Sequence, residues 1–196
     1  MLKKQPDGLV VSTLLPVPHC YTTRALGDMK KSEKNRERMV RRVFGTVNLV
    51  IAEQVHGSEV AIVDGTKGYI PSVDALVARI RPGSKVTLGV FVADCVPMLL
   101  VDPNSAIIAT VHAGWKGTLG AVTKNAVETM RKLGGSMSDI RVSIGPHIGM
   151  CHYDVPKERA QKFLNAFGND PKVASYFERG WHVDIGWANY RQLIDC

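Results

Sequence analysis

The stretch "ADCVPMLLVDPNSAIIATVHAGWKGT", residues 93–118, contains two apolar runs with a turn sequence between them. The runs at 97–102 and 106–112 are short and rich in Val, Ile and Leu, as is typical of buried strands. We therefore predict two core strands here. Cys95 stands at the start of the first run and His112 at the end of the second. Core strands favour aliphatic residues at such places, so these two polar side chains need an explanation.

The rest of the chain mixes strand-like and helix-like patterns without strict βαβ order. Further strands are predicted at residues 8–15, 19–24, 46–55, 58–64, 73–79, 86–93 and 140–146, with turns at 82–84 and 102–105. Helices are predicted at 30–44, 118–134, 157–168 and 188–194. Thr118 is the predicted N-cap and Gly134 the predicted C-cap of the second helix. This mixture predicts one layered α/β (α+β-like) domain over residues 1–196, with a mixed β-sheet and flanking helices.

The composition is that of an ordinary globular protein. Of the 196 residues, 45% are hydrophobic, which suffices for a buried core. No apolar run reaches the ~18 residues of a transmembrane helix, and the N-terminal "MLKKQPDG" lacks an apolar signal-peptide stretch. The cysteines form no C-x-x-C pair, which argues against a disulfide framework or a zinc ribbon: Cys20, Cys95, Cys151 and Cys196. We therefore expect a cytoplasmic protein without membrane contact.

The chain is basic, with a net charge of +7 and an isoelectric point near 9.3. Much of the excess lies in "MKKSEKNRERMVRR", residues 29–42, with seven basic and two acidic residues. A solvated helix face explains such a run. Nucleic-acid binding is disfavoured, because no aromatic residues interleave with the charges and no recognised binding module is present. A basic surface also attracts phosphorylated small molecules into a cleft.

Three residues of metal-ligand type stand at predicted strand ends: His56, Cys95 and His112. Taken singly, a buried cysteine is more often a small hydrophobic residue, and a lone histidine a structural one. A turn-type or rigid residue follows each of them closely, which lets the side chain project from a strand end: Gly57, Pro97 and Gly114. If the strands are neighbours, two imidazoles and one thiolate converge. Such a set suits zinc, and an open fourth position marks a catalytic rather than a structural site.

Five motifs in order resemble the YfiH-like laccase-domain family, whose members are known as polyphenol oxidases, peptidoglycan editing factors and purine nucleoside phosphorylases. The motifs are "QVHG" (54–57), "DALV" (74–77), "ADCVPMLLVDP" (93–103), "VHAGWKGT" (111–118) and "IGPHIGMCHYDV" (144–155), and the resemblance runs from Thr22 to Leu193. It implies the family's single α/β fold, with His56, Cys95 and His112 as zinc ligands that are catalytic through the metal. It also implies a zinc-dependent phosphorylase of adenosine, inosine, guanosine or methylthioadenosine, with adenosine deamination as a further activity.

The resemblance also marks cationic residues near the zinc site. Arg24 matches a family arginine, Asn35–Arg36 match a family pair, and Lys116 stands where the family commonly has arginine. We expect Arg24 and Lys116 to contact phosphate, because a fixed cation favours an incoming dianion. A surface salt bridge is the alternative for each.

The last two motifs carry further candidates. A helix beginning near Thr118 is expected to hold a phosphate at the 114–118 turn through its N-terminal N–H groups. Cys151 and His147 either line the cleft or form a structural turn.

The sequence departs from the family pattern in three places. The segment between Gly27 and Asn35 is short, and Lys116 replaces an arginine, which gives up bidentate recognition of an anion. The chain also stops at Cys196, before the family's terminal strand. The domain is therefore predicted to be short at its C-terminus, which affects the substrate pocket rather than the metal triad.

Three other functions stay open from the sequence. A His₂Cys set with Met98 as a weak axial ligand describes an electron-transfer copper site, but reducing oxygen requires a copper cluster, and His19, His152 and His182 have no evident place in one. The same zinc site also suits hydrolysis of an amide in a peptidoglycan precursor. A non-enzymatic nucleic-acid or scaffold module is disfavoured, because polar residues at strand ends cost stability unless they are used. The expected cofactor is zinc, with copper as the alternative, and the expected ligands are a nucleoside and phosphate; the oligomeric state is left open.

Overall fold

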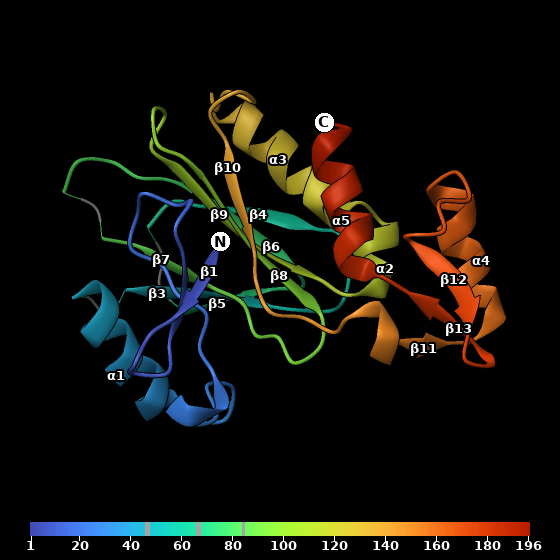
Figure 1. Cartoon of the computed structure of the whole chain (residues 1–196). Helices are drawn as coiled ribbons and strands as arrows, with labels where there is room; N and C mark the ends of the chain where they lie inside the picture. The colour runs from blue at the N-terminus through green and yellow to red at the C-terminus, as the bar shows by residue number, and fades with distance from the viewer. Residues whose placement is uncertain (46–47, 66–67, 84) are drawn as a thin grey trace.

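The computed structural model of the chain describes residues 1–45, 48–65, 68–83 and 85–196. The first two positions of the predicted strand 46–55 and the last position of the predicted turn 82–84 lie outside the described residues. Figure 1 shows three layers, which are the helices α3 (Val122–Lys132) and α5 (Ile185–Ile194), a five-stranded sheet, and a three-stranded sheet on its opposite face. This arrangement confirms the predicted layered α/β fold with a mixed sheet and flanking helices.

The central sheet has the strand order β10-β8-β9-β6-β4. Its strands are β4 (Val60–Val63), β6 (Ala75–Arg79), β8 (Val96–Asp102), β9 (Ile107–Ala113) and β10 (Arg141–Ile144). Neighbours pair antiparallel except β4 and β6, which are parallel. The two predicted core strands are β8 and β9, and they pair from Val96 opposite Ala113 to Asp102 opposite Ile107.

Both faces of the central sheet are covered, and the strand period of two decides which residue faces which layer. In β6, Ala75 and Val77 belong to the apolar cluster that includes α3. Leu76 and Ala78 belong to the cluster against the three-stranded sheet. All four side chains are buried. Burial on both faces explains why these strands form continuous apolar runs in the sequence.

The second sheet contains β3 (Leu49–Glu53), β5 (Gly68–Pro71) and β7 (Thr87–Gly89), all parallel, in the order β5-β3-β7. Its Val50 and Ala52 pack against Leu76 of the central sheet. The sequence does not predict β5, whose four residues begin with Gly and end with Pro. The predicted strand 86–93 is wrong beyond Gly89.

The first residues of the chain form less strand than the sequence predicts. β1 (Leu2–Lys4) and β2 (Val10–Ser12) make a small antiparallel pair. Only the middle of the predicted strand 8–15 is therefore part of a sheet. Two prolines follow it, Pro16 and Pro18, and neither can donate a backbone hydrogen bond to a ladder.

The predicted strand 19–24 is wrong. The segment makes a single bridge, between Val10 and Tyr21, and then enters the 3-10 helix η1 (Arg24–Leu26). Tyr21 anchors the segment through its side chain, since its buried hydroxyl donates to the Ser143 carbonyl at 2.8 Å. The N-terminal region is thereby attached to β10 by a side chain rather than by a strand ladder.

The helix α1 (Glu33–Phe44) lies within the predicted helix 30–44 but begins three residues later. Ser32 is its N-cap, and its hydroxyl accepts the backbone N–H of Asn35 at 3.2 Å. Upstream, the Asp28 carboxylate accepts the next backbone N–H groups and forms a turn instead of a helical one. The competing turn explains the late start.

The predicted helix 118–134 is two helices in the structure. α2 (Trp115–Leu119) is separated from α3 by Ala121, which has a positive φ of 59°. Gly120 packs against Ser58, where a Cβ atom would come within 3.0 Å of the serine Cβ. The close packing of this corner against the loop after β3 requires the break, and no periodicity in the sequence reports it.

The two predicted caps of this helix have different outcomes. Thr118 is not an N-cap, because it lies buried inside α2 and its hydroxyl donates to the Gly114 carbonyl at 2.9 Å. Gly114 itself precedes the first helical residue. The C-cap of α3 is Leu133, one residue before the predicted Gly134, and Gly134 follows it with a φ of 89°, in the left-handed region that favours glycine.

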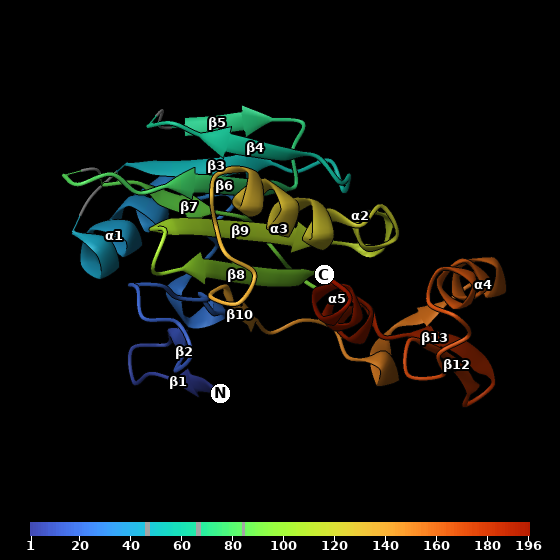
Figure 2. The same ribbon diagram turned by 90° about the horizontal axis from the view of Figure 1, so that it is seen from above.

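The C-terminal part of the chain builds a smaller unit beside the main sheet (Figure 2). The 3-10 helix η2 (Met150–His152) leads into it. Its sheet of β11 (Asp154–Val155), β12 (Ala174–Phe177) and β13 (Gly180–Val183) is antiparallel and packs against α4 (Lys157–Ala166). The predicted helix 157–168 is confirmed as α4, whereas the sequence does not predict these short strands.

The last helix, α5, begins three residues before the predicted start at 188. The Asp184 carboxylate accepts the backbone N–H of Trp187 at 2.7 Å and caps the earlier turn. Like the other helices in the described ranges, α5 lacks the combination of length and apolar character that crossing a membrane requires.

Asp102 closes the turn between β8 and β9 from a fully buried position. Its carboxylate accepts the backbone N–H groups of Asn104 at 2.9 Å, Ser105 at 3.0 Å and Ser136 at 2.8 Å. Burial opposes ionisation, but these hydrogen bonds outweigh it and hold the pKa of Asp102 below its ordinary value. The carboxylate thus fixes the turn in its charged form.

We expect Asp102→Asn to lower the free energy of unfolding by about 2–3 kcal/mol at neutral pH, because an amide accepts fewer of these N–H groups. The folded-state pKa lies below the unfolded one of about 3.9, so the stabilisation is present above about pH 4 and is lost as the pH falls through the folded pKa. Urea unfolding of both proteins at neutral and acid pH measures the difference. A difference that persists undiminished at acid pH would contradict this role.

Candidate metal centre

Three side chains meet at one end of the central sheet. His56, Cys95 and His112 each place one ligand atom within 4.8 Å of the others. His56 lies in the loop between β3 and β4, Cys95 directly precedes β8, and His112 lies near the end of β9. In the part of the chain that the structure describes, this is the one such group of His, Cys, Asp or Glu residues. The structure therefore brings together the three residues that the sequence analysis names as ligands.

The pairing of β8 with β9 explains how Cys95 and His112 meet. His112 is opposite Pro97, and the next residue, Ala113, is opposite Val96. The start of β8 therefore lies beside the end of β9. Two residues 17 positions apart in the sequence become neighbours through one antiparallel ladder.

Two glycines let the backbone of α2 approach the cluster. A Cβ atom at Gly114 would lie 3.0 Å from His56 Cδ2 and 3.1 Å from Cys95 Sγ, so any side chain there would push the candidate ligands apart. A Cβ atom at Gly117 would lie 2.6 Å from the Gly57 carbonyl oxygen. Both glycines are required by space, and together they close α2 against the His56 loop.

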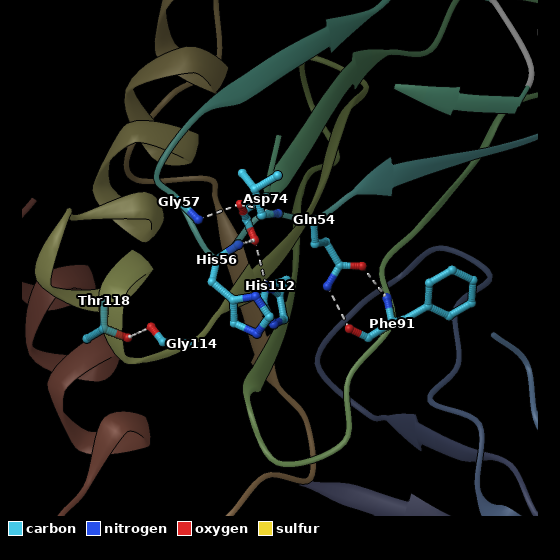
Figure 3. A network of polar contacts seen from close by, with 9 residues as sticks. Gln54, His56, Gly57, Asp74, Phe91, His112, Gly114 and Thr118 are labelled. Atoms are coloured by element: carbon cyan, nitrogen blue, oxygen red, sulfur yellow. Dashed lines mark hydrogen bonds and ion pairs between the residues drawn. The ribbon is translucent and has the colours of Figure 1, made fainter. Parts of the chain in front are cut away.

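A buried carboxylate, that of Asp74, organises both histidines (Figure 3). Its Oδ2 accepts the backbone N–H groups of Gly57 at 2.7 Å and Val55 at 3.2 Å. Its Oδ1 accepts the backbone N–H of His56 at 3.0 Å and lies 2.7 Å from His112 Nδ1. Asp74 stands in the sequence motif "DALV", which by itself assigns it no role; an acidic residue at the start of an apolar strand is the signal that identifies it.

The contact with Asp74 fixes the ring of His112. Because the carboxylate accepts, we assign the proton to Nδ1, which leaves the Nε2 lone pair free, as in metal-bound histidines. Burial lowers the pKa of His112 against the effect of the Asp74 carboxylate, and the positive charge of Lys30 lowers it further. The ring is thus kept in the neutral form that binds a metal.

The environment of Cys95 favours the thiol over the thiolate. Burial raises the pKa of Cys95, and the negative charges of Asp94 and Asp74 raise it further. The side chain is therefore not prepared as a free nucleophile. A cation bound beside the sulfur would stabilise the thiolate, so this setting suits a ligand rather than an attacking group.

His56 has a left-handed backbone conformation, with a φ of 60°. This region costs a non-glycine residue roughly 1–2 kcal/mol. The hydrogen bonds from the His56 loop to Asp74 hold the conformation in place. A strained residue kept in a candidate site supports a functional role for its side chain.

Gln54 ties the His56 loop to the segment that leads to Cys95. Its side-chain nitrogen donates to the Phe91 carbonyl at 2.7 Å, and its side-chain oxygen accepts the Phe91 N–H at 2.8 Å (Figure 3). This two-ended contact fixes the position of the loop before β8 relative to the end of β3.

The two predicted phosphate contacts lie in different surroundings. Lys116 is exposed on α2, with its ammonium nitrogen 5.7 Å from the centre of the Trp115 ring and two residues from Gly114 at the cluster. Arg24 is exposed at the start of η1, and none of the polar contacts described for it joins it to the cluster. The phosphate-binding roles of Lys116 and Arg24 both stay predictions. The position of Lys116 near Gly114 favours its role over that of Arg24.

The Asn35–Arg36 pair contributes to the N-terminal region. Arg36 donates to the carbonyls of Met29 at 2.7 Å and Lys30 at 2.9 Å, and its guanidinium carbon lies 5.8 Å from the centre of the Phe91 ring. It thereby holds the turn that carries Lys30, whose charge reaches His112. Lys30 is not predicted as a site residue from the sequence, because nothing local distinguishes it from the other lysines of its run.

His147 and Cys151 are not part of the cluster. His147 Nδ1 lies 2.8 Å from the Gly145 carbonyl, and its ring packs against Gly186 of α5. The exposed Cys151 Sγ lies 3.0 Å from His152 Nδ1. These contacts favour the structural-turn interpretation of this motif over the cleft-lining one.

The helix geometry does not favour the phosphate that is expected at the 114–118 turn. The expectation depends on the macrodipole of a long helix beginning near Thr118. α2 has only five residues and is separated from α3 at Ala121. Its N-terminus is therefore not the end of the predicted helix, and recognition of an anion here has to come from side-chain cations.

The fold and the cluster define a class of layered α/β proteins with a His-Cys-His group open to solvent at His56. A family model described as "Multi-copper polyphenol oxidoreductase laccase" matches residues 21–196. The chain belongs to this family of laccase-domain proteins, which confirms the resemblance seen in the sequence motifs.

Characterised relatives carry names of nucleoside enzymes. The chain is 34% identical over 198 residues to "Purine nucleoside phosphorylase" of Deinococcus radiodurans, covering 92% of this chain and 75% of that protein. It is 42% identical to "Purine nucleoside phosphorylase ORF3" of Streptomyces griseus, covering 81% of this chain and 64% of the relative. It is 34% identical to "Adenosine deaminase RL5" of an unknown prokaryotic organism, and spans 59% of that protein's length.

Solved structures share the fold. The crystal structure of YlmD from Geobacillus stearothermophilus is 29% identical, with a TM-score of 0.76 over 87% of this chain and 67% of that chain. YfiH from Bacillus licheniformis has a TM-score of 0.79 at 23% identity, over 99% of this chain and 83% of its own. The second likeness shows the fold alone.

Asp74→Asn tests the organising role of the carboxylate. We expect the variant to bind zinc about 10–100-fold more weakly, because an amide both misorients His112 and turns a donor toward the N–H groups of the His56 loop. Competition with a chromogenic chelator measures the affinity. Asp64→Asn, the same change at an exposed position after β4, is the matched control and should leave it unchanged. If Asp74→Asn binds zinc with the wild-type affinity, the carboxylate does not organise the metal centre.

Proposed function

We propose that this protein is a zinc-dependent enzyme acting on purine nucleosides, with phosphorolysis of the glycosidic bond as its reaction and adenosine deamination as a further activity. The observation that carries the proposal is the convergence of His56, Cys95 and His112 around one point, with Asp74 fixing the second histidine. The names of the relatives support purine nucleosides as the substrate class. Adenosine, inosine, guanosine and methylthioadenosine are the proposed substrates.

The donor set fits zinc. Catalytic zinc sites take three protein ligands from nitrogen, sulfur and oxygen donors and leave a fourth position open. Ligand atoms in such a tetrahedral site lie about 3.5 Å apart, so a group within 4.8 Å needs only small side-chain movements. His56 is exposed, and the cluster is therefore reachable by a small molecule. When bound, zinc supplies a Lewis acid and lowers the pKa of a water molecule in the open position.

The residues of the chain supply orientation and charge. Asp74 holds His112 in one tautomer and one direction, and Gly114 leaves the space that the ligands need. Phosphorolysis sets a phosphate against C1′ of the ribose and passes through an oxocarbenium-like transition state. We propose that Lys116 on α2 and Lys30, whose positive charge lowers the pKa of His112, offset the charge of the incoming phosphate.

Copper-dependent phenol oxidation has less support, although the family description names it. Met98, the expected axial ligand, is buried under α3, and its sulfur accepts from the Thr123 hydroxyl at 3.7 Å. Of the other histidines, His19 accepts the Ser12 N–H and His182 stacks on Phe177. Within the described residues these side chains build no second cluster of ligands for a multi-copper site.

We place the activity in the cytoplasm. The four cysteines are unpaired, and a ligand such as Cys95 has to stay reduced to bind a metal.

Amide hydrolysis on a peptidoglycan precursor would use the same three ligands, and the substrate assay below separates it from nucleoside chemistry.

The purified protein is expected to contain about one zinc ion per chain when it is prepared without chelator. Cys95→Ala should remove the metal and leave the fold intact, because β8 and β9 are held by their ladder and by the apolar clusters on both faces. Elemental analysis and circular dichroism of both proteins measure the two effects. Loss of the fold in Cys95→Ala would make the metal structural, and metal-free wild type would end the zinc proposal.

Incubation with adenosine and inorganic phosphate is expected to yield adenine and ribose 1-phosphate. Chromatography of the products, with and without phosphate, decides the reaction class. Base release without phosphate would indicate a hydrolase, and inosine formation would indicate deamination. The Cys95→Ala protein is the matched control, since it should lose every one of these activities. A wild-type protein that leaves nucleosides unchanged but hydrolyses a muramyl amide would favour the editing function.

A further inference from the structure

Arg159 of α4 lies on the ring of Trp115, the first residue of α2. Its guanidinium carbon is 4.4 Å from the ring centre, which is closer than any other cation on an aromatic ring among the described residues. This stack joins the smaller C-terminal unit to the helix that borders the candidate metal centre. A planar guanidinium on an indole face is fixed in orientation, with its N–H donors directed sideways.

The guanidinium of Arg159 is partly buried and lacks a carboxylate partner among the described ion pairs. Arg191 shows the contrast, because it is similarly buried but paired with Asp170 at 2.8 Å. Taking a cation partly out of water without a counter-ion is unfavourable. The donors of Arg159 that do not contact Tyr153 are therefore proposed to be available for an anion.

The position of Arg159 relates it to the candidate metal centre. Trp115 directly follows Gly114, whose Cβ position touches both His56 and Cys95. Arg159 therefore lies on the side chain of the residue that follows the glycine packed against two of the candidate ligands. Lys116 lies 5.7 Å from the centre of the same ring, so Trp115 carries two cations.

Tyr153 connects Arg159 to the other side of the cluster. The Ile148 N–H donates to the Asp94 carbonyl at 2.9 Å, which brings the loop before Tyr153 alongside the residue preceding Cys95. Burial raises the pKa of Tyr153, the charge and hydrogen bonding of Arg159 lower it, and the charges of Cys95 and Asp94 raise it. The phenol therefore stays neutral, and its oxygen accepts a hydrogen bond from the Arg159 guanidinium.

We infer that Arg159, held on Trp115 beside Tyr153, is an oxyanion-binding residue of this site and takes a phosphoryl group. The fork of a guanidinium matches two oxygens of a phosphate, and Lys116 on the same ring adds a point charge. The inference rests on the proposed function, because it names the group that holds the phosphate for phosphorolysis.

Arg159→Gln is the central variant, since glutamine keeps a planar group on Trp115 without the charge. We expect it to weaken binding of inorganic phosphate to the full chain by about tenfold to hundredfold, measured by isothermal titration calorimetry. Arg159→Lys keeps the charge but loses the two-pronged guanidinium. Its affinity for inorganic phosphate should lie between those of the wild type and Arg159→Gln. Lys162→Ala removes a positive charge from an exposed position of the same helix and should change the affinity by less than about twofold.

Adenosine 5′-monophosphate distinguishes the source of the phosphoryl group. If Arg159→Gln weakens the binding of inorganic phosphate, the residue binds free phosphate. If the variant weakens only the binding of the monophosphate, the site takes a phosphate ester. The oxyanion-binding role of Arg159 stands in either case. Unchanged binding of both in Arg159→Gln and Arg159→Lys would overturn it. Circular dichroism confirms that the variants are folded, and Arg159→Lys carries the test if Arg159→Gln is not.

Steady-state kinetics separates this inference from the proposed function. In Arg159→Gln we expect a raised KM for phosphate with an unchanged KM for adenosine. Phosphorolysis with an unaltered KM for phosphate, together with unchanged binding of the monophosphate, would overturn the role of Arg159 and leave the proposed function standing. If the protein binds phosphate through Arg159 but does not cleave nucleosides, the oxyanion-binding role of Arg159 stands and the proposed phosphorolysis is wrong.

Discussion

The structure of the site depends on one buried charge, the carboxylate of Asp74. It accepts from the three successive N–H groups of the His56 loop and from His112, while its backbone bonds to Glu59 on one side and to the N–H of His112 on the other. A carboxylate taken out of water is stable only when its oxygens are satisfied in this way. The alignment of β6 in the sheet and the placement of both histidines are therefore consequences of the same residue.

The three candidate ligands come from separate segments, and a different contact joins each pair of segments. The β8–β9 ladder joins Cys95 to His112, and the amide of Gln54 joins the His56 loop to the chain before Cys95. Close packing at Gly117 joins the same loop to α2. These contacts come from the central sheet, from a side chain after β3 and from α2, so several parts of the fold preorganise the site together. The cations proposed to bind phosphate lie on α2, α4 and the turn before α1.

The sequence predicts the centre of this fold better than its edges. The apolar runs of β8 and β9 and the polar residues at their ends are local signals, and they suffice to bring Cys95 and His112 forward as candidates. The break at Ala121 and the strands β5, β12 and β13 depend on packing between distant segments or are too short to leave a pattern. Arg159 is an ordinary helical arginine in the sequence. Only the docking of α4 places it on Trp115, so no local motif identifies it.

The left-handed backbone at His56 restricts the evolutionary freedom of this corner. Among residues other than glycine, that region is enriched in Asn, Asp and His. Of these, histidine and aspartate are common metal ligands, whereas cysteine and glutamate would carry a conformational penalty at this position. Sequence drift can therefore exchange an imidazole for a short carboxylate here more readily than for a thiolate. The loop geometry, more than the cluster itself, limits which metals a descendant of this protein could come to prefer.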